Sequence, residues 1–275
     1  MIGSLAYASL TDWQQQVADP TLRGSLFVAG PAGSGKTTAA VHRLRKLLST
    51  GVRPDSILVL LPQRTLVRPY REALQDPEIP EGAAVPVATI GGLAKRLVEL
   101  FWPLVAETAG FAEPSQEPVF LTMETAQYYM ARAMQPLFRE GCFDSLSIDR
   151  NRIYSQIIDN LNKSAVVGFD HTEIGERLIA ASAGNRQSES LYCDVQRAVT
   201  LFRQYCLRHG LLDFSLQMEV FSRHLIHVQL ARRYLSKLHR HVIADNIEED
   251  TPVAHDLLLS WLADLSSAVV VYDED

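Results

Sequence analysis

The sequence has few cysteines and no long hydrophobic run. Cys142, Cys193 and Cys206 are too few and too widely spaced for a disulfide framework or a zinc site, which favours a reducing, cytoplasmic environment. No apolar stretch approaches the roughly 18 residues of a membrane-spanning helix, so we expect no membrane partner. The first residues also lack the basic segment and the sustained apolar core of a secretory signal peptide.

Charge of one sign does not dominate the chain, although its formal net charge is −6. Nine acidic residues lie between Asp245 and Asp275, a segment without Lys or Arg, and outside it the basic residues outnumber the acidic ones. Residues 221–241 contain five Lys or Arg and no acid. Such a run is typical of a solvated helix face, but the overall charge does not exclude a phosphate-binding surface.

The first hundred residues alternate short apolar runs with segments of helical periodicity. A short helix is expected near 12–17, capped by Thr11 or Asp12. The expected strands are 24–29, 56–61 and 84–89, and the expected helices are 37–48, a stretch ending at 74, and 92–100. Strands and helices that alternate in this way predict an α/β fold, with a buried parallel sheet flanked by helices.

The pattern changes near residue 101. Helical periodicity continues to about residue 238 without a convincing strand, which predicts an inserted all-helical subdomain. The α/β pattern then resumes with expected strands at 241–244 and 268–272 around a helix at 253–262. Because a parallel strand is normally covered by a following helix, a chain that stops at residue 275 is expected to be a fragment of a longer protein.

Residues 30–37 read GPAGSGKT and fit the phosphate-binding pattern G-x-x-x-x-G-K-[ST] in full. The glycines allow a tight turn in which successive N–H groups face phosphate oxygens, and the helix that follows adds its positive N-terminal end. Lys36 is expected to neutralise the β- and γ-phosphates, and the Thr37 hydroxyl to bind Mg²⁺. The loop follows an expected strand and precedes an expected helix, so the sequence predicts a nucleotide site.

A second metal ligand is expected at the end of another strand. Asp245 follows the apolar run 241–244 and is the predicted Mg²⁺ ligand. The acids just beyond it, Glu248 and Glu249, either orient the attacking water or belong to a solvated loop. The predicted catalytic residues are therefore Lys36, Asp245, Glu248 and Glu249.

The order of several short motifs resembles the N-terminal part of a superfamily 1 DNA helicase of the UvrD/Rep type. Besides the phosphate-binding loop, the segments that carry the resemblance are LTDWQ at 10–14 (Q motif), ILVLLPQRT at 57–65 (motif Ia), VATIGGLA at 87–94 (motif Ib), LDF at 212–214, DNIEEDTP at 245–252 (motif II) and AVVVYDED at 268–275 (the strand before motif III).

This resemblance implies a RecA-like P-loop NTPase domain (1A) from residues 1–100 and 205–275, interrupted by a helical subdomain (1B) at 101–204. It implies ATP and Mg²⁺ as cofactors, and single-stranded DNA and repair proteins as partners. It also implies that the second RecA-like domain of such helicases lies outside this chain, so that the chain alone does not unwind DNA.

The resemblance extends to individual residues. Gln14 matches the glutamine that reads the adenine, and residues of motifs Ia and Ib line the DNA track. The implied nucleotide-binding residues are Gln14, Gly30, Pro31, Ala32, Gly33, Ser34, Gly35, Lys36, Thr37 and Thr38. The implied DNA-binding residues are Gln63, Arg64 and Thr89. Tyr70, Phe101 and Trp102 are candidates for stacking on bases, although core packing is favoured for the last two.

The sequence departs from the helicase pattern in motif II. Asn246 stands where the family has a water-activating glutamate, and an amide cannot accept a proton at neutral pH. Either Glu248 or Glu249 replaces that base, or hydrolysis is impaired. Two alternatives to an active helicase therefore remain: a non-catalytic helicase relative that binds DNA or a repair partner, and another P-loop enzyme such as a kinase.

Overall fold

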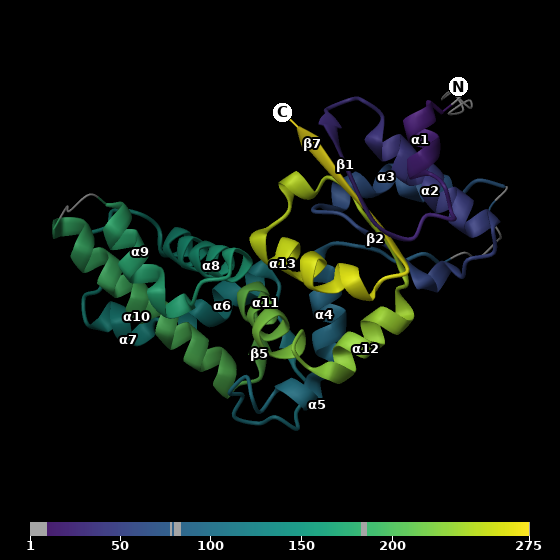
Figure 1. Cartoon of the computed structure of the whole chain (residues 1–275). Helices are drawn as coiled ribbons and strands as arrows, with labels where there is room; N and C mark the ends of the chain where they lie inside the picture. Colours follow the sequence, from purple (N-terminus) through teal and green to yellow (C-terminus); the bar gives the residue numbers. More distant parts are fainter. Residues whose placement is uncertain (1–9, 78, 80–83, 183–185, 275) are drawn as a thin grey trace. The chain divides into compact units, whose positions relative to one another are not determined.

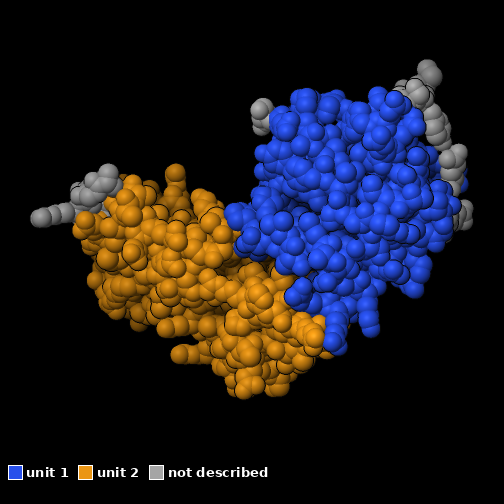
Figure 2. All heavy atoms as spheres, viewed as in Figure 1, with its two compact units in different colours: residues 1–93, 232–275 blue, residues 94–231 orange. Residues whose placement is uncertain are grey.

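The computed structural model describes residues 10–77, 79, 84–182 and 186–274. It divides into two compact units, which Figure 2 distinguishes by colour. One unit comprises Met1–Leu93 and Arg232–Asp275, and the other comprises Ala94–Ala231. Helices α4 (Ile90–Leu100) and α12 (Gln229–Leu238) carry the chain from the first unit to the second and back.

The first unit contains a five-stranded parallel sheet with the order β1-β7-β6-β2-β3. Figure 1 shows β7 beside β1. Its strands are β1 (Gly24–Pro31), β2 (Ile57–Leu60), β3 (Val87–Ala88), β6 (His241–Ala244) and β7 (Ser267–Glu274). The strands from the C-terminal segment, β6 and β7, lie between β1 and β2. The α/β fold with a parallel sheet flanked by helices is thus confirmed.

Three helices pack with one face of this sheet in a single hydrophobic cluster: α1 (Asp12–Val17), α2 (Lys36–Ser49) and α3 (Arg68–Leu74). Helix α2 contributes Ala40, Leu44 and Leu47, whose spacing places them on one side of the helix. The opposite face is buried over the central strands, where Leu58 and Val242 alternate with the residues of the cluster. Burial on both faces explains why these strands read as continuous apolar runs.

Short elements connect the strands of the first unit. They are the 3-10 turns at Pro54–Ser56, Arg64–Val67, Ile247–Glu249 and Leu262–Asp264, and helix α13 (Pro252–Trp261). Thr251 caps α13 by accepting a hydrogen bond from the Ala254 N–H, and Pro252 occupies the first turn, where a missing N–H costs nothing.

The second unit is almost entirely helical. Its helices are α5 (Trp102–Val105), α6 (Met123–Ala133), α7 (Gln135–Arg139), α8 (Arg150–Val167), α9 (Ile174–Ala181), α10 (Arg186–Arg208) and α11 (Phe214–Glu219), with further turns at His171–Glu173 and Val220–Leu225. A two-residue parallel pair, β4 (Val119–Phe120) with β5 (Leu211–Leu212), is the one strand pairing in its described part. Among the described residues of both units, no helix is long and apolar enough to span a membrane.

The structure differs from the sequence expectations at four places. The inserted subdomain is not all-helical, because β4 and β5 pair within it. Strand β1 is an outer strand, so the expected buried run has only Val28 buried, while Phe27 is 59% exposed. The third expected strand shortens to Val87–Ala88. The helical unit spans 94–231 rather than 101–204, because α11 packs on α8 and β5 packs on α10.

Candidate functional site

The carboxyl ends of four neighbouring strands meet at one edge of the sheet. Because the strands are parallel, the loop after β1, the end of β7, the residue after β6 and the segment after β2 all emerge at this edge. It brings together the phosphate-binding loop, Asp273, Asp245 and Gln63. Ligands of open parallel sheets bind at this kind of edge.

The phosphate-binding loop connects β1 to α2 through two left-handed glycines. Gly33 has φ +76° and Gly35, the residue that caps α2, has φ +91°. Only glycine adopts these angles without strain. The Gln14 side chain lies against the loop, since its Nε2 donates to the Gly35 carbonyl oxygen at 3.2 Å and its Oε1 accepts from the Thr11 N–H at 3.0 Å.

The Lys36 ammonium is buried within its own loop. Nζ lies 2.6 Å from the Gly30 carbonyl oxygen, 2.7 Å from that of Pro31, 3.1 Å from Ser34 Oγ and 2.7 Å from Asp273 Oδ1. An ammonium has three hydrogens to donate, so four acceptors already saturate it. A phosphate that binds Lys36 must therefore replace one of these contacts, and the Asp273 carboxylate is the one that carries a competing charge.

Thr37 and Asp245 provide two oxygens for a magnesium ion. The Thr37 hydroxyl donates to Asp245 Oδ1 at 3.4 Å. Mg²⁺ holds oxygen ligands at about 2.1 Å, so two oxygens bound to one ion lie no more than about 4.2 Å apart. The observed separation satisfies this limit, and hydroxyl and carboxylate oxygens are the hard ligands that Mg²⁺ prefers. The pair therefore fits the metal that the sequence predicts.

Tyr70 orients Asp245 from the core. Its hydroxyl donates to Asp245 Oδ2 at 2.7 Å, and the whole side chain is buried. The expectation that Tyr70 stacks on bases is therefore wrong. Phe101 and Trp102 are buried, which agrees with the core packing that the sequence analysis favours for both.

Burial sets the electrostatics of Asp245. Desolvation raises the pKa of its carboxyl, hydrogen bonds from Tyr70, Thr37 and the Asn246 N–H counteract the rise, and the nearby charge of Asp273 adds to it. Burial, followed by the charge of Asp245, also raises the pKa of the Tyr70 phenol well above its usual value, so this hydroxyl remains a donor. A cation next to Asp245 would offset the free-energy cost of burying its charged carboxylate.

The acidic residues after Asp245 are tied to neighbouring groups. Asn246 has φ +59°, a left-handed conformation that asparagine tolerates, and its Nδ2 donates to Glu248 Oε1 at 3.3 Å. Glu248 Oε2 accepts from the Asp273 N–H at 3.0 Å, and Glu249 Oε2 accepts from Gln63 Nε2 at 2.8 Å. Both glutamates thus lie at the edge that holds Lys36 and Asp245.

The predicted DNA-binding residues have different surroundings. Gln63 is exposed and contacts Glu249 as described, and Arg64 is exposed on the turn after β2. Thr89 is half-buried, and its hydroxyl accepts from the Gly92 N–H at 3.2 Å at the start of α4. A helix-capping role accounts for this threonine.

The remaining predicted nucleotide-binding residues follow the course of the loop. Exposed positions are Pro31, Ala32, Gly33, Ser34 and Thr38, and half-buried ones are Gln14, Gly30, Gly35 and Thr37. Sequence reasoning missed the contacts of Asp273 with Lys36 and of Tyr70 with Asp245. For Asp273 a usable indication existed, because it ends an apolar run and so had to lie at a strand end.

Comparison with protein families gives a match in the first third of the chain. Residues 11–100, about a third of the chain, match the family model of the DEAD/DEAH box helicase. The match includes the phosphate-binding loop and ends before Asp245, and it supports a helicase-type P-loop domain without distinguishing the UvrD/Rep type from other helicases. No curated protein matches the sequence.

Proposed function

We propose that this chain is the ATP-binding region of a UvrD/Rep-type DNA helicase or translocase that acts on single-stranded DNA in repair or recombination. The observation that carries the proposal is the convergence of Lys36, Thr37 and Asp245 at one sheet edge, although Asp245 is more than 200 positions away in the sequence. The helicase-domain match over residues 11–100 agrees with an ATP-dependent activity on nucleic acid.

Each residue of the site has a defined task in this proposal. The left-handed glycines of the loop turn backbone N–H groups towards the phosphates, and Lys36 donates to the β- and γ-phosphate oxygens. Thr37 and Asp245 hold Mg²⁺, which neutralises charge on those phosphates. Gln14, which contacts the loop through Gly35, is the proposed reader of the adenine.

Either Glu248 or Glu249 activates the attacking water in place of the family's glutamate. Glu248 is linked to the backbone of β7 and Glu249 to Gln63 at the end of β2, so both carboxylates lie within reach of this edge. In this proposal, Gln63, Arg64 and Thr89 follow the DNA strand. The units 1–93/232–275 and 94–231 correspond to subdomains 1A and 1B.

Binding of a fluorescent ATP analogue with Mg²⁺ tests the nucleotide site. We expect Lys36→Ala to weaken binding at least tenfold, since it removes a charge-assisted contact. Lys46→Ala is the matched control, because Lys46 lies on the same helix at the end away from the loop. Equal binding by all three proteins would refute the nucleotide site.

Anisotropy titrations with labelled single-stranded DNA and RNA of one sequence test the nucleic-acid partner. Arg64→Ala is expected to weaken DNA binding and to lower its salt dependence by about one phosphate contact. Tighter binding of the RNA, or an unchanged salt dependence in Arg64→Ala, would contradict this part of the proposal.

A non-hydrolysing helicase relative is a second candidate, favoured by Asn246. The position directly after Asp245 carries an amide instead of a carboxylate, and this amide donates to Glu248. Turnover in Asn246→Glu, Glu248→Gln and Glu249→Gln separates the two candidates. A large gain in the first variant favours the degenerate site, whereas a loss in either glutamine variant identifies the working base.

A further inference from the structure

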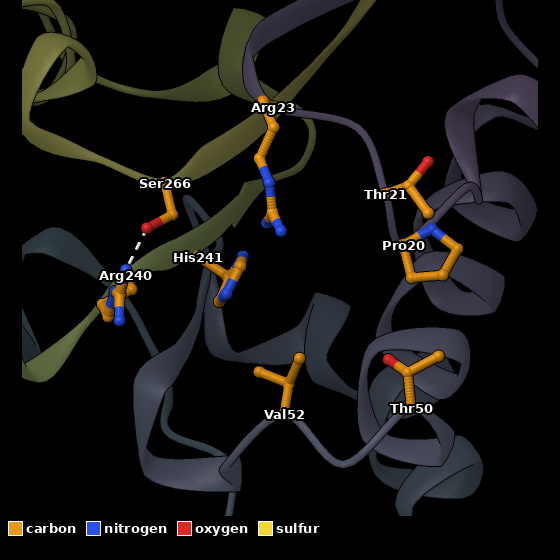
Figure 3. Close-up of a pocket in the computed structure, with 8 residues that line it drawn as sticks. All are labelled: Pro20, Thr21, Arg23, Thr50, Val52, Arg240, His241 and Ser266. Carbon is orange, nitrogen blue, oxygen red and sulfur yellow. Dashed lines mark hydrogen bonds between the residues drawn. The ribbon is translucent and has the colours of Figure 1, made fainter.

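A pocket opens at the edge of the sheet opposite the phosphate-binding loop, where β1, β6 and β7 begin. Its volume is about 670 Å³, and its lining includes Arg23, Arg240, His241 and Ser266 (Figure 3). The eight residues of β1 span roughly 23 Å and separate it from the phosphate-binding loop at the other end of the strand. The two sites therefore take different ligands.

The pocket is lined by cations without acidic partners. Arg23 and Arg240 are exposed, and within the part of the chain that the structure describes neither forms an ion pair. Arg240 Nε donates to Ser266 Oγ at 3.1 Å, and in Figure 3 the Arg23 side chain extends towards His241. The nearby Asp19 carboxylate accepts from the N–H and the hydroxyl of Thr21, and its charge acts on Arg43 and Lys46 rather than on Arg23 or Arg240.

A buried arginine lies behind the pocket wall. The Arg43 side chain is fully buried, and its partners are the carbonyl oxygens of Val17 and Asp19 and the hydroxyl of Ser267, all of them neutral. Its Nε has no hydrogen-bond partner within the described residues. Burial lowers the pKa of this guanidinium to about 10, the charge of the Asp19 carboxylate opposes that lowering, and the charge of Arg23 adds to it.

His241 links the buried arginine to the pocket. Its Nδ1 lies 2.8 Å from Ser267 Oγ, which also accepts from Arg43 at 2.8 Å. Burial lowers the pKa of the imidazole, and so do the charges of Arg43, Arg23 and Arg240, which places three cations around this one ring. An anion in the pocket would offset all of these charges together.

We infer that this pocket binds a small phosphorylated anion of the pyrophosphate or polyphosphate class. The volume is that of a small-molecule site, and guanidinium groups match phosphate oxygens in charge and in geometry. The Ser266 hydroxyl, which accepts from Arg240, adds a neutral donor to the lining, whereas the Thr21 hydroxyl already donates to Asp19. A concave site of this size accommodates a compact anion rather than a continuous nucleic-acid strand.

Calorimetric titration of the chain with pyrophosphate, without Mg²⁺, tests this inference. Binding is expected to persist in Lys36→Ala, which disables the other phosphate site, and to weaken about tenfold in each of Arg23→Ala and Arg240→Ala. Arg68→Ala is the matched control, because Arg68 is exposed and paired with Glu72 outside both sites. Circular dichroism of each variant confirms that the fold is retained.

Three results would overturn the inference. The first is undetectable binding by the unmodified chain, and the second is loss of binding in Lys36→Ala with no effect of the pocket variants. The third concerns an oligonucleotide without terminal phosphates: its binding weakens in Arg23→Ala and Arg240→Ala, while the binding of pyrophosphate is unchanged in both variants. If Lys36→Ala no longer binds the ATP analogue but still binds pyrophosphate, the pocket and the proposed nucleotide site are two independent sites.

Discussion

The Tyr70 hydroxyl donates a hydrogen bond to Asp245 Oδ2 at 2.7 Å, while Asp245 Oδ1 faces the Thr37 hydroxyl. The two carboxylate oxygens thus have different partners, one in the core and one at the proposed metal position. Tyr70 is completely buried on α3, so this contact fixes the rotation of the carboxylate from behind. The helix after β2 therefore helps to shape a site whose ligands come from β6 and α2.

Tyr70→Phe is expected to destabilise the chain and to weaken its response to Mg²⁺. Removal of the hydroxyl leaves a buried carboxylate oxygen without a donor, which costs about 1–3 kcal/mol of unfolding free energy. Without its anchor, Asp245 is also free to rotate, so Mg²⁺ should promote binding of an ATP analogue only at concentrations about threefold higher or more.

Urea denaturation and Mg²⁺ titrations measure the two effects of Tyr70→Phe. Tyr154→Phe is the control, because Tyr154 is also buried but lies in the helical unit and has no hydrogen-bonded hydroxyl within the described residues. Equal stability losses in the two variants would indicate that the hydroxyl contact with Asp245 contributes nothing.

Asp245→Asn is expected to stabilise the metal-free chain while it abolishes the response to Mg²⁺. Burial raises the pKa of Asp245 above 3.8, so the folded state holds this proton more tightly than the unfolded state does. The contribution of Asp245 to stability is therefore largest below pH 3.8 and is lost as the pH rises through the folded-state pKa. Asparagine has no charge to desolvate, and its amide oxygen still accepts from Tyr70. Its NH2 group replaces the oxygen that accepts from Thr37 and the Asn246 N–H, and the loss of these two bonds offsets part of the gain.

Urea denaturation from pH 3.5 to 7.5 checks the sign of this effect. The stability advantage of Asp245→Asn should be near zero at the acid end and should grow with pH to about 1 kcal/mol or more. Burial also raises the pKa of Asp250. This residue is present in both proteins, so its contribution cancels in the difference between their stabilities. Asp256→Asn, an exposed change on α13, should show no such growth. An advantage that shrinks with rising pH would contradict the argument.

Much of the fold could be predicted because its apolar pattern is local. Strands β2 and β6 and the first five residues of β7 are buried on both faces and appear as apolar runs, and Asp12–Val17 forms the expected first helix. The exposure of Phe27 could not be predicted, since the composition of β1 does not reveal that it is an outer strand. The extent of the helical unit was also missed, because periodicity shows that a segment is helical but not which neighbours it packs against.

The candidate site also has a part that could be predicted from the sequence and a part that could not. Lys36 and Thr37 belong to one continuous pattern, and Asp245 follows from the rule that polar residues after parallel strands share one edge. The contact between Lys36 and Asp273 depends on β7 lying directly beside β1, a neighbour relation that the sequence does not contain. The tyrosine contact depends on the rotation of α3, which only packing against the sheet determines.

Asp273→Asn is expected to tighten binding of the ATP analogue about threefold to tenfold. The carboxylate lies 2.7 Å from Lys36 Nζ, and this ion pair must break before the ammonium can bind a phosphate. Its removal lowers that cost and also removes a negative charge near the incoming phosphates. Fluorescence titration measures the change, with Glu274→Gln as the exposed neighbouring control. Weaker binding by Asp273→Asn would instead assign the carboxylate a part in holding the nucleotide or the metal.

Gly35→Ala is expected to abolish nucleotide binding and to destabilise the chain by about 2 kcal/mol or more. Two causes combine: φ is +91°, where an L side chain is strained, and a Cβ would lie 2.5 Å from Gln14 Nε2. Gly51→Ala provides the matched control, because Gly51 has φ +83° but open space around its Cβ position. It should show the backbone strain alone, about 1 kcal/mol, and normal binding.

The double variant Gln14→Ala/Gly35→Ala separates the two causes. Removal of the Gln14 side chain takes away the steric conflict and leaves the strain of the left-handed backbone, so stability should recover to near that of Gly51→Ala. Nucleotide binding should remain weak for two reasons: the strained backbone at residue 35 still misdirects the loop N–H groups, and the proposed adenine contact of Gln14 is also lost. Urea denaturation and analogue titration report the two outcomes separately. Full recovery of binding in the double variant would show that contact with Gln14, rather than the left-handed turn at Gly35, governs the loop.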